Sequence, residues 1–454
     1  MWKGLERIHD FIWGVPAVFL ILGTGIYLTI RTKFVQIRLF PRALRRFGAE
    51  IVFRKKNDSS TSPMRALCTA LAATVGTGNL AGVAGAIAIG GPGSIFWMWI
   101  SAVLGMVTKF AEAVLSVQYR ARGTNGEVLS GPMYMIQNGM SPRWKWLAIL
   151  YAFCGSFAAL GVGNATQVNA VVGGINGVIQ AAGGTPNLKS NIIIGLILMC
   201  LVGAVLLGGV KRIGQVAERL VPIGAIVYIV LAVYVLANRY RAIPTAFATI
   251  IGGAFTPEAV TGGAIGSVLQ ALTVGMRRGV FTNEAGMGTA AIAHGAADVG
   301  HPVEQGFMGI IEVFLDTIVI CTLTALVILC SGITISFGQD TGIMLTAQAF
   351  ENVCGSWVHI ILSAILVTFA IATILGWGLY GMRCVQYLFG EKSWRLFVWL
   401  QIGTIFLGAL LNTATVWVLA EIVNGLMALP NLIALLYLSP ELIRLLNNYQ
   451  VENC

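Results

Sequence analysis

The chain has 454 residues, of which 57% are hydrophobic and 11% are charged, and its formal net charge is +10. Soluble domains carry about 25% charged residues, so this composition excludes an ordinary soluble protein and indicates a polytopic membrane protein. In a soluble chain such a basic charge would suggest nucleic acid as a partner. Here the charge gathers in loops between apolar segments, and we expect no nucleic-acid binding.

Apolar segments long enough to cross a membrane fill most of the chain. A bilayer core of ~30 Å takes about 20 residues of helix. Eleven segments qualify: 11–30, 66–90, 94–118, 146–180, 191–210, 215–238, 262–292, 306–330, 356–381, 396–412 and 416–438. No large soluble domain remains beside them. We therefore predict an all-α polytopic membrane protein of about eleven transmembrane helices.

The first segment, within residues 1–30, is followed by a strongly basic stretch at 31–65. By the positive-inside rule that stretch is cytoplasmic, so the N-terminus lies outside and the tail 439–454 lies inside. The segment lacks a small-residue cleavage site and is expected to be retained as a helix. The basic stretch also has an amphipathic piece at 37–40, which would bind anionic membrane lipid.

Residues 66–90 contain Gly76, Thr77, Gly78 and Asn79 in an otherwise apolar segment. Glycine costs roughly 1 kcal/mol relative to alanine inside a helix, and backbone groups freed by a break must face a partner or a wet cavity. Ions and small zwitterions bind at such breaks in secondary transporters. Close helix packing is the alternative, but it explains a Gly-Thr-Gly-Asn run less well than a binding site does.

The segment 262–292 also carries glycines, and Thr273-Val274-Gly275 repeats the Thr74-Val75-Gly76 of the first interrupted segment. Each segment opens a group of five. The first group covers 66–238 and the second covers 262–438, joined by an extracellular connection at 239–261. Since five is odd, the second group is inverted relative to the first. Interrupted segments at matching positions of two halves point to a transport site.

Two further segments carry polar groups suited to a small solute. Asn164, Gln167 and Asn169 lie in one apolar helix, and Gln167 is one turn from Asn164. Hydrogen bonding between helices is the alternative role of these amides. Thr373 and Trp377 are spaced i, i+4, which places a hydroxyl beneath an aromatic wall. Trp377 would otherwise belong to the interfacial aromatic belt.

Charged residues inside apolar segments are candidates for function by default. Lys109 and Glu112 favour an intrahelical pair or snorkelling. Glu312 and Asp316, at i, i+4, would bind an ion or a proton, or pair with Arg277 or Lys109. The remaining charges flank the second interruption, where they would form a cytoplasmic gate or pair with one another: Arg277, Arg278 and Glu284. No histidine is central enough in the sequence to indicate a proton relay.

The sequence contains no enzyme motif. It has no Walker motif, so ATP does not drive it directly, and it has no HExxH, CxxC or GxSxG pattern. The eight cysteines are scattered without metal-ligand spacing and are expected to be buried small hydrophobes. We therefore expect a transporter and not an enzyme.

Several motifs resemble one known family. The longest is GGPGSIFWMWISAVLG at 90–105, accompanied by GTGNLAGVA at 76–84, GVFTNEAG at 279–286, FLDT at 314–317 and LGW at 375–377. The first looks like the signature of the alanine or glycine:cation symporters (sodium:alanine symporters) of the amino acid–polyamine–cation superfamily. The resemblance spans nearly the whole chain. It implies a LeuT-like 5+5 inverted repeat with one extra N-terminal helix, in a plasma membrane, such as a bacterial inner membrane.

The resemblance also implies a ligand set. It places substrate contacts on Thr77, Gly78, Asn79, Gln167, Thr273, Gly275, Thr373 and Trp377, and Na⁺ near Ala73, Gly76, Ala370 and Thr373. Some relatives are expected to have serine at position 372, where this chain has Ala372, which leaves one hydroxyl fewer for Na⁺. Thr273 stands where the family has a bulkier methionine, so a larger substrate such as glutamine would fit.

The sequence thus predicts a monomeric symporter that takes up alanine and glycine with Na⁺ by alternating access. Uptake coupled to H⁺ is the nearest alternative, with Glu312 or Asp316 as the proton carrier. Glutamine as the main substrate is another. A passive channel is an alternative of a different class, because two broken helices could line a pore; its uptake would neither saturate nor accumulate solute.

Overall fold

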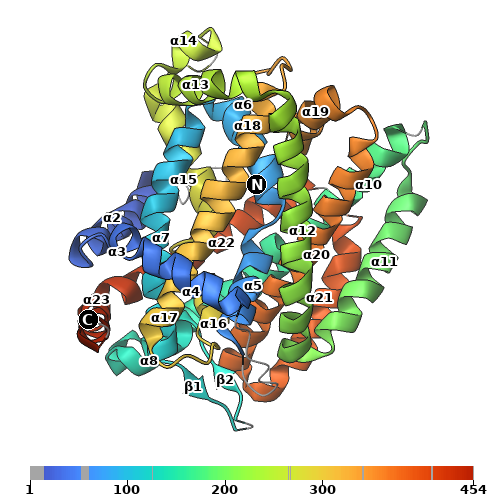
Figure 1. Ribbon diagram of the computed structural model, residues 1–454. Helices are drawn as coiled ribbons and strands as arrows, with labels where there is room; N and C mark the ends of the chain where they lie inside the picture. Colours follow the sequence, from blue (N-terminus) through green and yellow to red (C-terminus); the bar gives the residue numbers. More distant parts are fainter. Residues whose placement is uncertain are drawn as a thin grey trace.

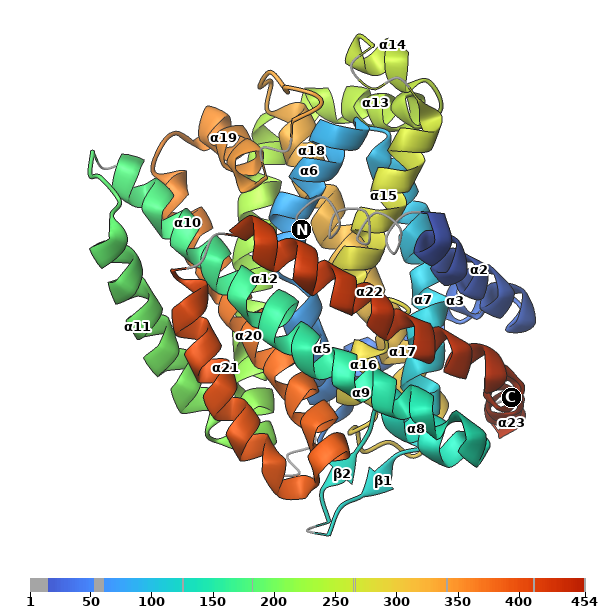
Figure 2. The same ribbon diagram turned by 180° about the vertical axis from the view of Figure 1, so that it is seen from behind.

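The computed structural model describes residues 15–52, 61–124, 126–181, 183–263, 265, 267–339, 342–410 and 413–452. Within these ranges the chain is helical apart from one hairpin, in which β1 (Ala121–Arg122) and β2 (Val128–Leu129) pair antiparallel. Figures 1 and 2 show tilted helices running between two ends of the molecule. Helices α13, α14 and α19 lie at one end, and the hairpin lies at the other.

The two groups of helices follow the order expected from the sequence. Before them come α2 (Val15–Arg31), α3 (Val35–Arg38) and α4 (Phe40–Val52). The first group is α5 (Pro63–Thr74), η1 (Gly78–Gly82), α6 (Val83–Gly90), α7 (Ser94–Gln118), α9 (Lys145–Leu160), η3 (Gly161–Ala165), α10 (Thr166–Ala181), α11 (Leu188–Leu206) and α12 (Gly209–Asn238). The second is α15 (Val268–Asn283), α16 (Thr289–His294), α17 (Pro302–Val313), η5 (Phe314–Cys321), α18 (Thr322–Cys330), α20 (Val358–Phe389), α21 (Trp394–Gly408) and α22 (Thr413–Tyr437).

Short elements connect these helices and cover the two ends. They are η2 (Pro142–Trp144), α8 (Pro132–Gly139), η4 (Tyr240–Ala242), α13 (Ile243–Phe255), α14 (Pro257–Thr261), α19 (Ile343–Cys354), η6 (Glu391–Ser393) and α23 (Ser439–Glu452). The polar stretch between α7 and α9 is thus a hairpin and a short helix rather than a span. The stretch 239–261, expected to connect the two groups, is folded as η4, α13 and α14.

Six helices of the described chain are long and apolar enough to cross a membrane, or up to eight if each of two bent pairs counts as one span. The other three predicted segments appear as shorter pieces, namely α2, α15 with α16, and α21. Large apolar side chains on α11 and α12 are exposed, among them Ile197, Ile223 and Val230. Exposed apolar surface on such helices suits contact with lipid, as the predicted membrane protein requires.

The first interruption lies where the sequence predicts it. Helix α5 begins at Pro63, with Ser62 accepting a hydrogen bond from the Arg65 amide at 3.1 Å, which is a normal helix start. It ends at Thr74, and the chain bends by 54° before it continues as η1 and α6. Gly76 lies inside this bend, where its Cβ would come within 2.7 Å of Thr373 Oγ1. Only glycine allows so close an approach.

The second interruption lies later than the repeated Thr-Val-Gly indicates. Helix α15 runs without a break through Thr273 and Gly275 and ends at Asn283. The break is at 284–288, where Glu284, Gly286 and Gly288 have φ values of 53°, 91° and 78°. A left-handed backbone of this kind ends a helix. Gly275 is instead a packing residue, since a Cβ there would lie 2.2 Å from the Ser94 carbonyl oxygen of α7.

Candidate transport site between two pockets

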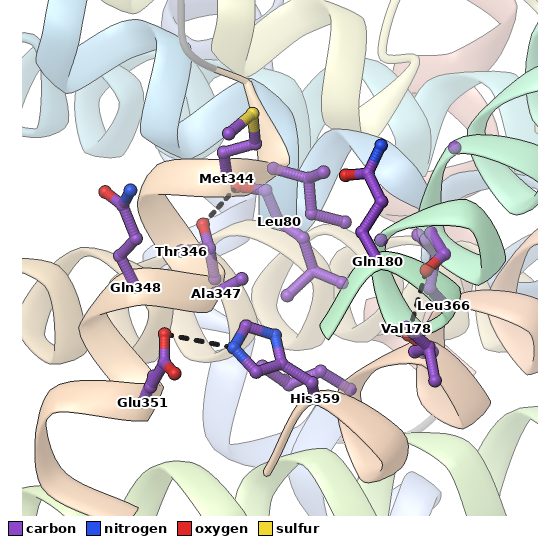
Figure 3. A pocket seen from close by; sticks show the side chains of 16 residues that line it. Leu80, Val178, Gln180, Met344, Thr346, Ala347, Gln348, Glu351, His359 and Leu366 are labelled. Carbon is purple, nitrogen blue, oxygen red and sulfur yellow. Dashed lines mark hydrogen bonds and ion pairs between the residues drawn. The ribbon is translucent and has the colours of Figure 1, made fainter. Parts of the chain in front are cut away.

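Two cavities lie at opposite ends of α20. The outer pocket, of about 390 Å³, is lined by α10, α19 and the start of α20, with Leu80 of η1 also on its wall. Figure 3 shows Thr346 beside Leu80 and Glu351 paired with His359 across this pocket. The inner pocket, of about 370 Å³, is lined by α5, the start of α12, the β1–β2 hairpin, the end of α16 and the end of α20. We name them by the membrane orientation that the basic loops predict.

The predicted binding residues lie between these two pockets. Along α20, Leu366 is the last residue on the outer pocket and Leu379 is the first on the inner pocket. Thr373 and Trp377, which fall between them, are 3% and 1% exposed. Thr69 of α5 reaches the inner pocket and Leu80 the outer one, so the first break also lies between them. The structure therefore encloses this region from both ends.

Polar contacts at the first break join three helices. The Gly76 amide donates to Asn79 Oδ1 at 2.8 Å, and Asn79 Nδ2 donates to Asp316 Oδ1 at 2.7 Å. Thr77 Oγ1 donates to Gln167 Oε1 at 3.2 Å. Asn79 and Asp316 lie in the π-helical segments η1 and η5, and Gln167 follows the third, η3. Such segments often mark functional sites. The structure thus brings Thr77, Asn79 and Gln167 together.

The predicted Na⁺ residues face one another across α5 and α20. A Cβ on Gly76 would lie 2.7 Å from Thr373 Oγ1, and a Cβ on Gly376 would lie 2.9 Å from the Ala73 amide nitrogen. Ala370 is one turn before Thr373 on the same helix and is fully buried. The Thr373 hydroxyl is buried without a hydrogen-bond partner in the described protein. Buried polar groups are normally paired, so this unpaired hydroxyl is the atom here that could take an oxygen-liganded cation.

Trp377 reaches the second break instead of the interface belt. Its ring packs against Gly163, where a Cβ would lie 2.2 Å from Trp377 Cβ. Its indole Nε1 donates to Glu284 Oε1 at 3.0 Å. The other carboxylate oxygen of Glu284 accepts from Thr289 Oγ1 at 2.6 Å. The second break and α20 are therefore joined directly beside the candidate site.

Glu112 holds the second break from its other side. One carboxylate oxygen accepts the Gly286 amide at 3.0 Å, the Gly288 amide at 3.1 Å and Asn431 Nδ2 at 2.8 Å. Successive backbone amides around left-handed residues form a nest for an anion. The ion pair expected between Lys109 and Glu112 is not formed among the described residues. Lys109 instead pairs with Glu312 of α17, and Glu112 accepts from the second break and from Asn431 of α22.

A second buried charge cluster lies next to this loop. Lys109 Nζ pairs with Glu312 Oε1 at 2.9 Å, and His294 Nε2 contacts Glu312 Oε2 at 2.8 Å. Gln305 Nε2 lies 2.6 Å from His294 Nδ1. All four residues are fully buried. The pairing of Glu312 with Lys109 was one of the two predicted alternatives. The sequence did not predict a role for His294, because its contact with Glu312 forms only when α16 and α17 pack together.

Thr273 and Gly275 lie apart from the other predicted residues. Thr273 Oγ1 donates to the Leu269 carbonyl of its own helix, and Gly275 packs on the start of α7. The residue of α15 beside the first break is Thr282, whose Oγ1 would lie 3.4 Å from a Cβ on Gly78. Thr282 is about 14 Å farther along the helix than Thr273, at 1.5 Å per residue. The repeated Thr-Val-Gly at 273–275 predicted a contact nearer the start of α15, and Thr282 was not predicted.

The remaining polar candidates serve helix packing. Asn164 Nδ2 donates to the Gln401 carbonyl at 2.8 Å, which is the interhelical role considered for this amide. Arg277 pairs with Glu421 of α22 at 3.0 Å. All cysteines of the described chain except Cys200 and Cys354 are buried.

Similarity to known proteins identifies the family of this chain. A model of the sodium:alanine symporter family matches residues 2–453. The chain belongs to the sodium:alanine symporter family. The sodium/alanine symporter AgcS of Methanococcus maripaludis is 43% identical over 96% of this chain and 94% of its own length. An uncharacterised transporter of Haemophilus influenzae is also 43% identical, over 98% and 95%.

Another relative has a different named substrate. The probable sodium/glutamine symporter GlnT of Bacillus subtilis is 37% identical over 97% of this chain and 89% of its own length. Among solved structures, MhsT in complex with L-phenylalanine matches with a TM-score of 0.61 at 12% identity, covering 84% of this chain and 89% of that one. This likeness shows a LeuT-like fold. The family member described here is a multi-pass plasma membrane transporter of amino acids and not an enzyme.

Proposed function

We propose that this transporter takes up alanine and glycine together with Na⁺ by alternating access. The observation that carries the proposal is the buried Thr373 hydroxyl, which has no hydrogen-bond partner in the part of the chain that the structure describes and faces Gly76 at the first break. A cation and a zwitterion at a helix break need carbonyl oxygens, hydroxyls and free amides. The first break and α20 supply these groups in one place.

In this proposal Na⁺ binds to the Thr373 hydroxyl and to carbonyl oxygens of Ala73, Gly76 and Ala370. Because these ligands come from both α5 and α20, the ion stabilises the arrangement in which the two helices are close. A ligand shifts a conformational equilibrium only by binding one state better than the other. Na⁺ and the substrate would therefore favour the same closed state, which couples their movements.

The substrate in this proposal lies against the first break. Amides at the start of η1, around Thr77 and Gly78, would receive its carboxylate, because a helix N-terminus attracts negative charge. Gln167 Oε1 would accept from its ammonium group, and Asn79 would hold the break in shape. Trp377 would close the pocket around a small side chain. The α15 residue that we propose to contact the substrate is Thr282, and not Thr273 or Gly275, because Thr282 lies beside Gly78.

The testing experiment is uptake of radiolabelled alanine into proteoliposomes with an inward Na⁺ gradient and, separately, with K⁺ in place of Na⁺. Accumulation above the outside concentration only with Na⁺ supports the proposal. Unlabelled glycine and glutamine, added as competitors, rank the substrates. Uptake that neither saturates nor accumulates would mean a passive channel and would overturn it.

Coupling to H⁺ is a second candidate because Asp316 contacts the first break. Its carboxylate is fully buried and accepts from Asn79 and Thr317, and it has no cationic partner among the described residues. Equal alanine uptake in Na⁺ and K⁺, together with a response to an imposed pH gradient, would favour this candidate. Loss of that pH response in Asp316→Asn would then identify the carrier.

A further inference from the structure

One hydrogen bond lies between the candidate site and the inner pocket. Trp377 is one turn from Thr373 on the side of α20 that leads to Leu379 and Arg383, which line the inner pocket. Its indole donates to Glu284 at the second break, at 3.0 Å. Both side chains are buried, at 1% and 5% exposed. The bond therefore lies in the protein interior, between the candidate site and the inner pocket.

The bond joins α20 to the loop that precedes α16, and both segments continue to the inner pocket. Ala293 of α16 and Ala296 line that pocket together with Leu379 and Arg383 of α20. Between the candidate site and the pocket, the loop before α16 is tied to α20 by Glu284 and Trp377. A solute leaving the candidate site toward the inner pocket between these helices must pass this pair.

Both partners of the bond are fixed on their own sides. Trp377 packs on Gly163, and its ring lies edge-on to Tyr380 at 5.8 Å between centroids. Glu284 is held by Thr289, and its loop is held by Glu112 of α7. The bond thus joins two parts that are each held by other contacts, and it would break if the loop before α16 moved away from α20.

We propose that the Trp377–Glu284 hydrogen bond is the inner gate contact of the transporter. It stabilises the state closed to the cytoplasm, and its opening connects the site with the inner pocket. Glu284 is a positioning residue in this inference, because it acts through Trp377. The inference rests on the proposed transport function, since a gate needs a site to enclose.

The test measures access to the inner pocket directly. Thr69 lines that pocket on α5 and is 4% exposed, so a cysteine there reports opening. The reporter Thr69→Cys is placed in a full-length chain whose eight native cysteines are replaced. Inside-out vesicles are then treated with a membrane-impermeant maleimide. We expect Glu284→Ala and Trp377→Phe each to raise the labelling rate about tenfold, which corresponds to about 1.4 kcal/mol.

Three further variants separate a gate from general damage. Glu284→Gln keeps an oxygen that can accept from the indole, so its labelling rate is expected to stay within about twofold of the parent. Trp99→Phe loses a comparable indole bond, to Thr322 Oγ1 at 2.8 Å, far from the gap, and should not change labelling. Thr289→Val removes the bond that holds Glu284 in place and should raise the labelling rate less than Glu284→Ala does.

The two partners should act as one unit. The double variant Glu284→Ala/Trp377→Phe is expected to label no faster than either single variant, because both remove the same bond. A double variant whose labelling rate rises by the product of the two single-variant increases would overturn the inference. A rise in Thr289→Val as large as that in Glu284→Ala would also overturn it. Parent-like labelling in both single variants would also overturn it.

The labelling assay does not depend on which solute is carried. If alanine uptake fails the Na⁺ test but labelling follows the pattern above, the proposed coupling is wrong and the gate stands. If uptake is Na⁺-coupled and labelling does not respond, the gate is wrong and the proposed function stands.

Discussion

The two helix breaks differ in how their polar groups are satisfied. At the second break, the Gly286 and Gly288 amides donate directly to a buried carboxylate oxygen of Glu112. At the first break, the Gly76 amide donates to the neutral side chain of Asn79, which in turn donates to the Asp316 carboxylate. Thr77 donates to the neutral Gln167, and the nearby Thr373 hydroxyl has no partner among the described residues. Charge-assisted bonds are about twice as strong as neutral ones. The second break is thus built to stay fixed, and the first is built to exchange its contacts.

The largest effect is expected where the second break is held. Glu112→Ala would leave the buried Gly286 and Gly288 amides without their acceptor and would remove one of the two acceptors of Asn431 Nδ2. Removing one partner of a buried charged network costs about 3–5 kcal/mol, so we expect little folded protein in detergent extracts, measured by size-exclusion chromatography. Glu112→Gln keeps an accepting oxygen and should be recovered in larger amounts. Equal recovery of parent and Glu112→Ala would contradict a structural role for this break.

At the first break the effect should fall on transport and not on folding. Gln167→Ala removes a neutral bond to Thr77 at 3.2 Å, worth about 1 kcal/mol, but it removes the proposed ammonium acceptor. We expect alanine uptake to fall at least about 100-fold while the thermal unfolding midpoint changes by only a few degrees. The same expectation for transport holds for Asn79→Ala. Normal uptake by either variant would exclude this pocket.

A smaller and more specific effect is expected from Thr373→Val. The substitution keeps the shape of the side chain and removes a hydroxyl that has no protein partner, so stability without Na⁺ should not fall. A ligand stabilises the state that it binds by RT ln(1 + [L]/Kd). We therefore expect the Na⁺-induced rise in melting temperature to disappear and the Na⁺ concentration for half-maximal uptake to rise about tenfold. An unchanged Na⁺ dependence would place the ion elsewhere.

The smallest effect is expected at Thr273. Its hydroxyl bonds to its own helix and lies on the exposed side of α15, so Thr273→Met should change the ratio of alanine to glutamine uptake by less than about twofold. Thr282→Val, beside Gly78, should change that ratio more. Competition of each amino acid against labelled alanine measures both. A larger change of this ratio in Thr273→Met than in Thr282→Val would place Thr273 in the substrate pocket.

The two breaks also differ in how well the sequence predicts their positions. The first break was predictable because Gly76, Gly78 and Asn79 are poor choices for a continuous span. The second was misplaced, because a Thr-Val-Gly repeat is also a helix-packing pattern, whereas the left-handed turn at Glu284 leaves little trace in composition.

A single sequence could suggest long-range pairs but could not choose among them. The pairing of Lys109 with Glu312, 203 positions apart, was one predicted alternative among others, and His294 becomes central only through Glu312. Periodicity reports which face of a helix is apolar, but it does not tell which other helix meets a buried charge. The gate partner of Trp377 was hidden for the same reason, although Glu284 itself had been noted beside the break.

The buried charges of α7 also have a consequence for biogenesis. Helix α7 is synthesised long before α17, so Lys109 enters the membrane 203 residues ahead of Glu312. At 5–20 residues per second this delay lasts about 10–40 s, and an unpartnered charge at the centre of a helix costs about 2.5–3.5 kcal/mol on insertion scales. Glu112 stands one turn from Lys109, where an i, i+3 pair can form. In the nascent chain these two residues can shield each other until the second half arrives and separates them.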